Sequence, residues 1–528
     1  MTAHPAAFLA EARRAPGRSL ISLGVLIALA ITPAIFAPAL YDDFTLPKQA
    51  SILVAAACIL AGLAMEGEFL PRHRAARLLL LGWVALLVVS FATGIDRRGS
   101  LLGYYQYRQG LLTQFGFVAL FLGAVSLARR PTAAWPAFAG LLGLGCVTFY
   151  TAVQSLGLDP VNWWTDTSVR AIGTIGNANE LGAYAVIALA FCALGQGRSP
   201  RAEMTITTFV AACSAFILLE SESRSGLLAL AVAFVAYPIG SVVIRQPWRA
   251  WSRRWLLLAC GIAVGALLSL AAGGAAGTAS RVQTGLHQQE ASGSTRMELW
   301  KGTLATISES PLSGFGPDGL HLAFPRYRPA DLGGAFLDYD LVAQSSHNAV
   351  LDIAANEGLP ALVAIVALLA LVAVRSVRHE RTSRGDSGVP FLWAALAGYV
   401  ALTMLNPVSL AAHALFFLLA GTLLGRSERP LPQPLAPKVP ARARLLLASP
   451  AVVALVAIAI LLPTADFVAN RAWEHYARGE FATAAGYYKS ASKLLPFERS
   501  YAESVADSWL AAGVTEGRPA LLKSVSAY

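Results

Sequence analysis

The sequence consists mainly of long apolar runs separated by short polar segments. An α-helix needs about 20 mostly apolar residues to cross a hydrocarbon core about 30 Å thick. Thirteen runs approach or reach this length, near residues 19–40, 49–65, 76–93, 110–128, 135–156, 180–196, 204–220, 224–244, 254–272, 356–374, 389–405, 410–425 and 445–463. The pattern predicts an all-α polytopic membrane protein with about 12–13 transmembrane helices.

Composition supports this class, because 56% of the residues are hydrophobic and only 14% are charged. Soluble domains carry about 25% charged residues. The five cysteines all fall within apolar runs and form no CxxC pair, so neither a disulfide framework nor a zinc site is indicated. The formal net charge of +10 is spread over the loops, and we expect no nucleic-acid partner.

Basic residues alternate from loop to loop. More than half of the 41 Lys and Arg residues lie in the short loops on one side of the predicted spans, together with the segment before the first span. The positive-inside rule places that side in the cytoplasm. A signal peptide is the competing interpretation of the N-terminus, but the first run lacks a small-residue cleavage site and is taken as an uncleaved span.

The alternation divides the chain into five regions. We expect a cytoplasmic N-terminus at residues 1–18, spans one to nine at 19–272 and a large periplasmic loop at 273–355. Spans ten to thirteen follow at 356–463, and a periplasmic tail at 464–528.

The longest polar interval between two membrane-length runs is Ser294–Gly358. Arg296 begins a predicted amphipathic outer helix, and a solvated surface role is its simplest alternative. His347 stands just before a helix that re-enters the bilayer. An outer-face histidine can act as a general base toward a sugar hydroxyl, whereas a helix-capping role is the alternative.

Two further arginines lie at the predicted outer ends of spans, where charge is costly and often functional. Arg224 is surrounded by small residues in ESESRSGLL; it is either a ligand-binding residue or an interfacial arginine paired with Glu220 or Glu222. Arg170 precedes a Gly- and Asn-rich turn that leads into a helix. Such a turn can present backbone N–H groups to an anion, or merely cap the helix.

Three outer arginines and one histidine, without a nucleotide motif or a paired-aspartate metal motif, are typical of a site for a diphosphate. The planar guanidinium binds phosphate oxygens in bidentate fashion and stays charged. A lipid diphosphate would place its head group at this depth, and no metal or other cofactor is expected.

The tail has a different pattern, with small and aromatic residues at helical spacing from Asn470 onward. It resembles one tetratricopeptide (TPR) repeat of about 34 residues. A single repeat buries little surface, so we expect the tail either to pack on the membrane body or to dock a protein partner.

Four motifs, in this order, resemble the bacterial O-antigen ligase and O-antigen polymerase superfamily: RAIGTIGNANELGAY, ESRSGLLAL, STRMELWKGTLATISESPLSGFG and SSHNAVLDIAANEGLPAL. The resemblance covers roughly residues 165–425. It implies a GT-C-like helical fold in the bacterial inner membrane and metal-independent, inverting glycosyl transfer from undecaprenyl diphosphate. It also implies diphosphate binding by Arg224 and Arg296, acceptor activation by His347 and a supporting role for Arg170.

The ligase type of reaction is the leading hypothesis, and the acceptor is left open between a lipid A core sugar, another lipid-linked glycan (a polymerase) and a protein hydroxyl. Two alternatives come from other classes. A transporter would show two-fold internal symmetry in its hydropathy, and a non-catalytic scaffold would use the tail to dock partners.

Overall fold

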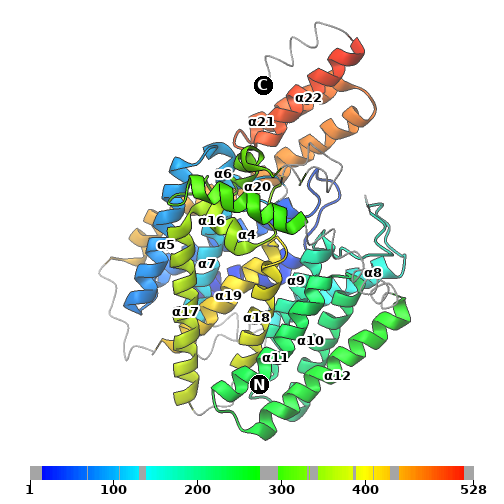
Figure 1. Ribbon diagram of the computed structural model, residues 1–528. Helices are drawn as coiled ribbons and strands as arrows, with labels where there is room; N and C mark the ends of the chain where they lie inside the picture. The colour runs from blue at the N-terminus through cyan, green and yellow to red at the C-terminus, as the bar shows by residue number, and fades with distance from the viewer. Residues whose placement is uncertain are drawn as a thin grey trace.

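The computed structural model describes residues 15–516, apart from 68, 106, 130–137, 164, 274–294, 330–331, 333–342, 384–387, 408 and 429–438. The predicted N-terminal segment and parts of the predicted loop and tail therefore lie outside the described residues. The described residues are helical and contain no strand (Figure 1). Within the described residues, eleven helices are long and apolar enough to cross a membrane, and two shorter apolar helices accompany them. The predicted all-α polytopic class is confirmed.

Each predicted span corresponds to a helical segment. The first is α2 with η1 and α3 (Pro16–Leu26, Ile27–Ile31, Thr32–Ala34), and the sixth is α9 with η3 (Ala178–Ala188, Leu189–Gly195). The others are α4 (Thr45–Glu66), α5 (Arg74–Thr93), α7 (Leu111–Ala128), α8 (Ala139–Ser155), α10 (Pro200–Glu220), α11 (Arg224–Val243), α12 (Trp248–Ala272), α17 (Leu359–Thr382), α18 (Val389–Thr403), α19 (Leu410–Ser427) and α20 (Ala441–Ala477).

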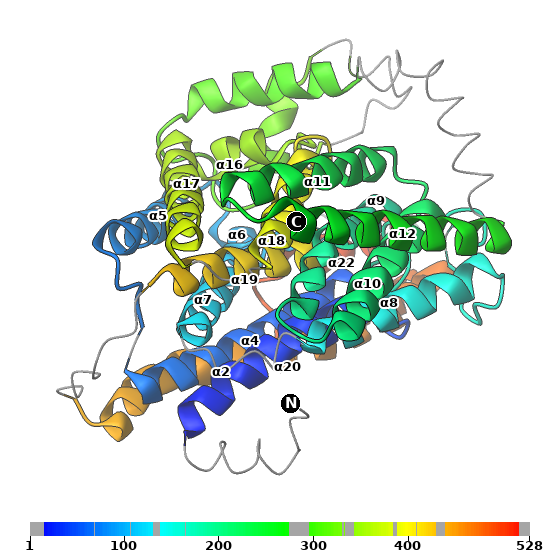
Figure 2. The ribbon, with the colours of Figure 1, turned by 90° about the horizontal axis from the view of Figure 1, so that it is seen from below.

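Small residues let the spans approach closely, as is typical of helices packed in a membrane. A side chain at Gly62 of α4 would collide with the backbone of α2. Gly421 on α19 lies in the same way against the backbone of α7, and Gly265 on α12 lies against the backbone of α10. Seen from below, α2, α4 and α20 lie together along one side of the bundle (Figure 2). Helices α10 and α12 lie side by side in the same view.

The interval between α12 and α17 forms its own small core at one end of the bundle. It contains a helix over residues 295–309, then α14 (Leu320–Ala323), η4 (Phe324–Tyr327) and α16 (Ala349–Glu357). Leu299, Phe324 and Ala355 are among the buried residues of this core. The turn at Phe315 is paired through backbone hydrogen bonds with Ala355 of α16 and with Ile95, just after α5. The N–H of Leu359, the first residue of α17, donates to the Pro311 carbonyl at 2.8 Å, so the interval is fixed to both α5 and α17.

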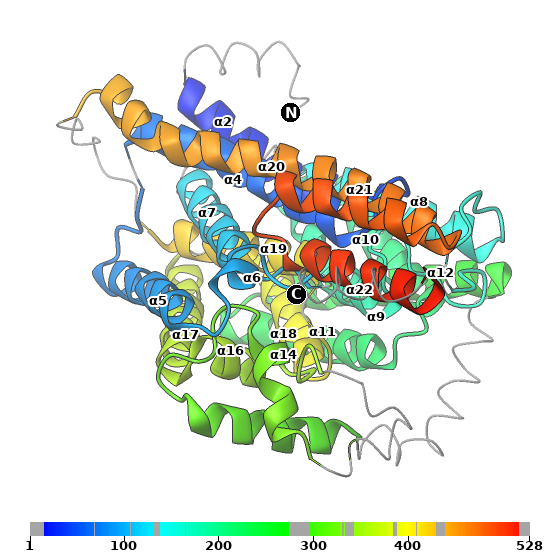
Figure 3. The same cartoon turned by 90° about the horizontal axis from the view of Figure 1, so that it is seen from above.

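The tail forms a helical hairpin at the same end of the bundle. Helix α20 continues past the span to Ala477, α21 (Phe481–Leu494) folds back on it, and α22 (Arg499–Glu516) packs on α21 (Figure 3). The tail therefore packs on the membrane body. The resemblance to a TPR repeat stays a prediction.

One buried arginine connects the tail to the body. Arg108 is fully buried; its Nε lies 3.0 Å from a carboxylate oxygen of Asp42, and its Nη1 lies 3.0 Å from a carboxylate oxygen of Glu498. Next to it, Asp466 of α20 accepts hydrogen bonds from the hydroxyls of Tyr105 and Tyr501, at 3.0 and 2.7 Å. Segments more than 350 residues apart in the chain are thus joined by charge and hydrogen bonding.

Replacing this arginine should loosen the tail. In Arg108→Gln, Asp42 and Glu498 lose their buried counter-charge, and breaking a buried pair from one side costs about 3–5 kcal/mol. We expect a clearly lower Tm of the purified protein in detergent and faster proteolytic release of the tail. Arg471→Gln removes an exposed pair with Glu474, worth at most about 1 kcal/mol. Equal Tm values for the two variants would contradict the proposed anchoring role.

Candidate functional site

His347 is the last residue but one before α16, in a turn stabilised by Asp352. The carboxylate of Asp352 accepts hydrogen bonds from the Ser345 hydroxyl at 2.6 Å, from the Ser346 hydroxyl at 2.7 Å and from the Ser346 N–H at 2.7 Å. The side chain of Asn348 caps α16 by accepting from the first backbone N–H groups of that helix. The sequence SSHN followed by Asp352 thus forms a closed turn with His347 at its centre.

The backbone of His347 is strained. Its φ is +57°, in the left-handed region that residues other than glycine rarely adopt, and its N–H donates to the Ser345 hydroxyl at 3.0 Å. Four of the five non-glycine residues with positive φ in the described chain lie in turns at this end of the bundle, namely Arg108, Glu222, Asp318 and His347. Strained backbone of this kind concentrates at functional sites.

Arg296 lies close enough to His347 to affect its charge. Its helix, over residues 295–309, is tied to the His347 turn because Trp300 Nε1 donates to the Ser346 carbonyl at 3.1 Å. Burial and then the positive charge of Arg296 lower the pKa of His347 to about 4. His347 is therefore neutral at pH 7 and able to accept a proton.

Arg296 is partly buried, and burial lowers its pKa, yet it forms no hydrogen bond or ion pair with the described residues. Arg224, the first residue of α11, is exposed and likewise has no such partner among the described residues. Neither guanidinium holds another residue in the part of the chain that the structure describes. Both are available to an anion.

A short segment after α18 links the start of α11 to the His347 turn. Asn406 donates to the hydroxyl of Ser225, the neighbour of Arg224, at 2.5 Å. Two residues earlier, the Met404 carbonyl accepts from the side chain of Asn348 at 3.3 Å. In the views from below and above, α11, α16 and α18 lie next to one another (Figures 2 and 3). The structure thus connects Arg224, Arg296 and His347 in one region.

Arg170 is placed differently from the other two arginines. Its Nε donates to the Ser221 carbonyl at 3.0 Å, and its Nη2 donates to the side chain of Asn179 at 2.8 Å. These bonds hold the turn before Arg224 against the start of α9. Arg170 therefore supports the segment that carries Arg224, and it is less available for a ligand than Arg224 or Arg296.

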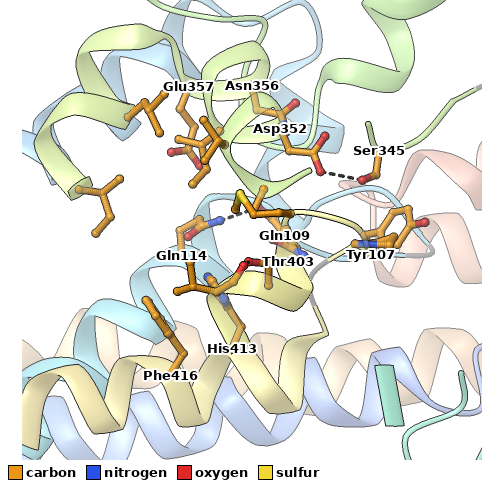
Figure 4. A pocket seen from close by; sticks show the side chains of 18 of the residues that line it. Tyr107, Gln109, Gln114, Ser345, Asp352, Asn356, Glu357, Thr403, His413 and Phe416 are labelled. Carbon is orange, nitrogen blue, oxygen red and sulfur yellow. Dashed lines mark hydrogen bonds between the residues drawn. The ribbon is translucent and has the colours of Figure 1, made fainter. Parts of the chain in front are cut away.

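A cavity of about 190 Å³ lies directly beside the His347 turn (Figure 4). His347 itself does not line it, but Ser345, Ala349 and Asp352 do. The inner wall is apolar, with residues of α5, α17, α18 and α19 that include Trp83, Leu362, Ile365, Val366, Leu369, Val400, Phe416 and Phe417. Val366 of α17 and Val400 of α18 are 51% and 43% exposed, so the cavity reaches the outer surface of the bundle between these helices.

The polar part of the lining comes from residues 344–357 and from the loop between α6 (Arg97–Leu102) and α7. Tyr107 and Gln109 line it together with Asp318. Asp318 accepts from the backbone N–H groups of Tyr104 at 2.6 Å and Gln109 at 3.3 Å, and burial raises its pKa to about 7. An apolar wall facing a polar wall suits an amphiphilic ligand.

Sequence reasoning did not identify Asp318, the 103–110 loop or His413, which reaches the cavity from α19. The aromatic and glycine-rich sequence GYYQYRQG between two predicted spans is a signal that could have drawn attention to this loop. The described residues contain no cluster of three or more His, Cys, Asp or Glu side chains that could hold a metal ion.

Residues 209–366 match the family model described as O-antigen ligase. This part of the chain is thus similar to the O-antigen ligase family, as the sequence motifs predicted. The match begins within α10 and ends within α17, so it contains Arg224, Arg296 and His347 but not Arg170 or the tail. No curated protein matches the chain. The matched domain supports a general class, the multi-pass membrane glycosyltransferases of the ligase and polymerase type.

The proximity of Arg296 and His347 in this O-antigen ligase domain can be tested by titration. Removing the positive charge in Arg296→Gln should raise the pKa of His347, because that charge disfavours the imidazolium ion. The readout is the modification of His347 by diethyl pyrocarbonate, followed by peptide mass spectrometry. We expect the pH of half-maximal modification to move upward. Arg326→Gln removes an exposed charge from the same interval and should leave this midpoint in place. Coincident midpoints in all three proteins would show that Arg296 does not act on His347.

Proposed function

We propose that the chain transfers a glycan from undecaprenyl diphosphate to an acceptor hydroxyl at the periplasmic face of the bacterial inner membrane. The observation that carries this proposal is the combination of a neutral, strained His347 with two arginines that have no partner among the described residues. The three arginines that are buried in the described chain are all paired: Arg108, Arg129 and Arg254 each face a carboxylate. A partly buried arginine left without a carboxylate is suited to bind an anion that arrives with the substrate.

In the proposed reaction, His347 accepts the proton of the acceptor hydroxyl while its oxygen attacks the anomeric carbon of the donor glycan. The bond between that carbon and the diphosphate oxygen breaks, and the diphosphate leaves with the electron pair. Arg224 and Arg296 stabilise the charge that develops on the leaving diphosphate. Attack opposite to the leaving group inverts the anomeric centre, and the lipid diphosphate itself supplies the driving energy.

The cavity beside the His347 turn supports a lipid-linked donor. Its apolar wall reaches the outer surface between α17 and α18, where lipid would surround the bundle, while its polar wall faces the 103–110 loop. A polyprenyl chain could enter from the side and leave its diphosphate at the end of the bundle that carries the arginines. The proposed orientation places this end, with the tail, on the periplasmic side, and leaves the basic loops in the cytoplasm.

Substitution of the three residues should separate their roles. A positioned general base contributes about 100- to 10,000-fold to a rate, so His347→Ala should lower kcat by that order and leave donor binding intact. Arg224→Gln and Arg296→Gln should weaken donor binding as well as slow transfer. The measurement is transfer by the purified protein from its lipid-linked glycan, with Arg326→Gln as the control.

Glycan profiles of complemented deletion strains would then distinguish the reaction types. A ligase defect leaves long lipid-linked chains unattached, a polymerase defect leaves single repeat units, and a defect in protein glycosylation leaves the lipopolysaccharide unchanged. Full activity in all three variants would contradict the proposed mechanism and favour a transporter or a scaffold.

A further inference from the structure

A second cavity, of about 270 Å³, lies between the tail and the membrane body. Three segments that are distant in sequence line it: α6 with the glycine that follows it, the turn that leads into α14, and the start of α22. Its lining includes Asp96, Tyr104, Asp318, His321, Arg499 and Glu503. None of the functions considered above accounts for this cavity.

The two cavities adjoin one another. Asp318 lines both of them, and its carboxylate holds the backbone of Tyr104 and of Gln109, which face the second and the first cavity respectively. A ligand in the second cavity would therefore lie one side chain away from the polar wall of the first. The second cavity extends from the site region toward the tail.

The tail side of the second cavity is fixed by ion pairs. Arg499 of α22 lies 3.3 Å from a carboxylate oxygen of Asp96 and 2.7 Å from one of Glu503. Directly before it, Glu498 is held by the buried Arg108. These contacts place hydrogen-bonding groups of the tail opposite those of the body, so the cavity exists only while the tail is docked.

The body side presents two aromatic rings. Tyr104 and His321 have ring centroids 4.0 Å apart and an interplanar angle of 34°. His321 Nδ1 lies 2.8 Å from the Asp318 carbonyl oxygen, which can only accept, so Nδ1 carries the hydrogen. Burial lowers the pKa of His321, and the neutral ring therefore keeps Nε2 as an acceptor.

This combination favours a neutral ligand rich in hydroxyl groups. The lining carries the acidic residues Asp96, Asp318, Glu498 and Glu503, and its one arginine, Arg499, already faces Asp96 and Glu503, so a phosphate or a carboxylate would find no free counter-charge there. Hydroxyl groups can donate to carboxylate oxygens and to His321 Nε2, and can accept from Arg499. The rings of Tyr104 and His321, with Leu322 and Pro325 nearby, offer apolar surface to the C–H face of a sugar ring.

We propose that this second cavity binds one neutral sugar unit of a glycan that the enzyme handles, so that the tail is part of the substrate-binding surface. The proposal rests on the function proposed above for its choice of ligand. Either the donor glycan or the acceptor glycan could supply the sugar unit, because both carry the same chemistry.

A side chain that fills the cavity tests the proposal. Ser500 lines the cavity on α22, whereas Ala502, two residues on, is exposed and does not line it. We expect Ser500→Trp to weaken binding of one glycan by at least about 10-fold and to raise the matching KM, while Ala502→Trp leaves both unchanged. Glu503→Gln keeps the shape of the cavity, removes one carboxylate and provides a second test if the tryptophan variant fails to fold.

Two free oligosaccharides serve as probes, the glycan released from the lipid donor by mild acid and the core oligosaccharide released from lipopolysaccharide. Binding is measured by saturation-transfer NMR, independently of transfer. Weaker binding of the first probe assigns the cavity to the donor glycan, and weaker binding of the second assigns it to the acceptor. Wild-type affinity for both probes in Ser500→Trp and Glu503→Gln overturns the proposal. Absence of transfer by the wild-type protein overturns the proposed function instead.

Discussion

The site depends first on the carboxylate of Asp352. Backbone outside helices must find hydrogen-bond partners within the protein when it lies near the membrane, and each missing partner is costly. Asp352 accepts one such bond from the Ser346 N–H and two more from the hydroxyls of Ser345 and Ser346, and this closes the turn in which His347 adopts its left-handed conformation. Trp300 then brings the Arg296 helix to the same turn, and Asn348 joins it to the end of α18. The contacts of Trp300 and Asn348 thus both involve the turn that Asp352 closes.

The distribution of paired and unpaired arginines separates structure from function. Arg108 is buried between two carboxylates and holds the tail, and Arg170 holds the turn before Arg224. Arg224 and Arg296 make no such contact with the described residues. Burying a charge is costly unless it is paired, and Arg296 is partly buried without a partner among the described residues. An incoming diphosphate would supply the missing pair, which links substrate binding to the stability of this end of the bundle.

The sequence predicted the helices well, because a membrane span has a required length and composition that a single chain displays directly. It also indicated Arg224 at the end of a span and Arg296 and His347 in the long polar interval, and their roles stay predictions. It could not separate Arg170 from them, because the partners of Arg170 at Ser221 and Asn179 are contacts of the folded chain. Asp318 and the tail cavity were missed for the same reason. The pair of Arg108 and Glu498 joins residues 390 positions apart, and no local pattern indicates it.

The central claim is that Arg224, Arg296 and His347 surround one diphosphate. The most direct test is whether a short-chain polyprenyl diphosphate protects His347 of the purified protein from diethyl pyrocarbonate at pH 7. We predict strong protection in the wild-type protein and in Arg326→Gln, and its loss in both Arg224→Gln and Arg296→Gln at the same ligand concentration. Modification of His347 at one rate with and without the ligand, or protection that survives the loss of either arginine, would contradict the claim.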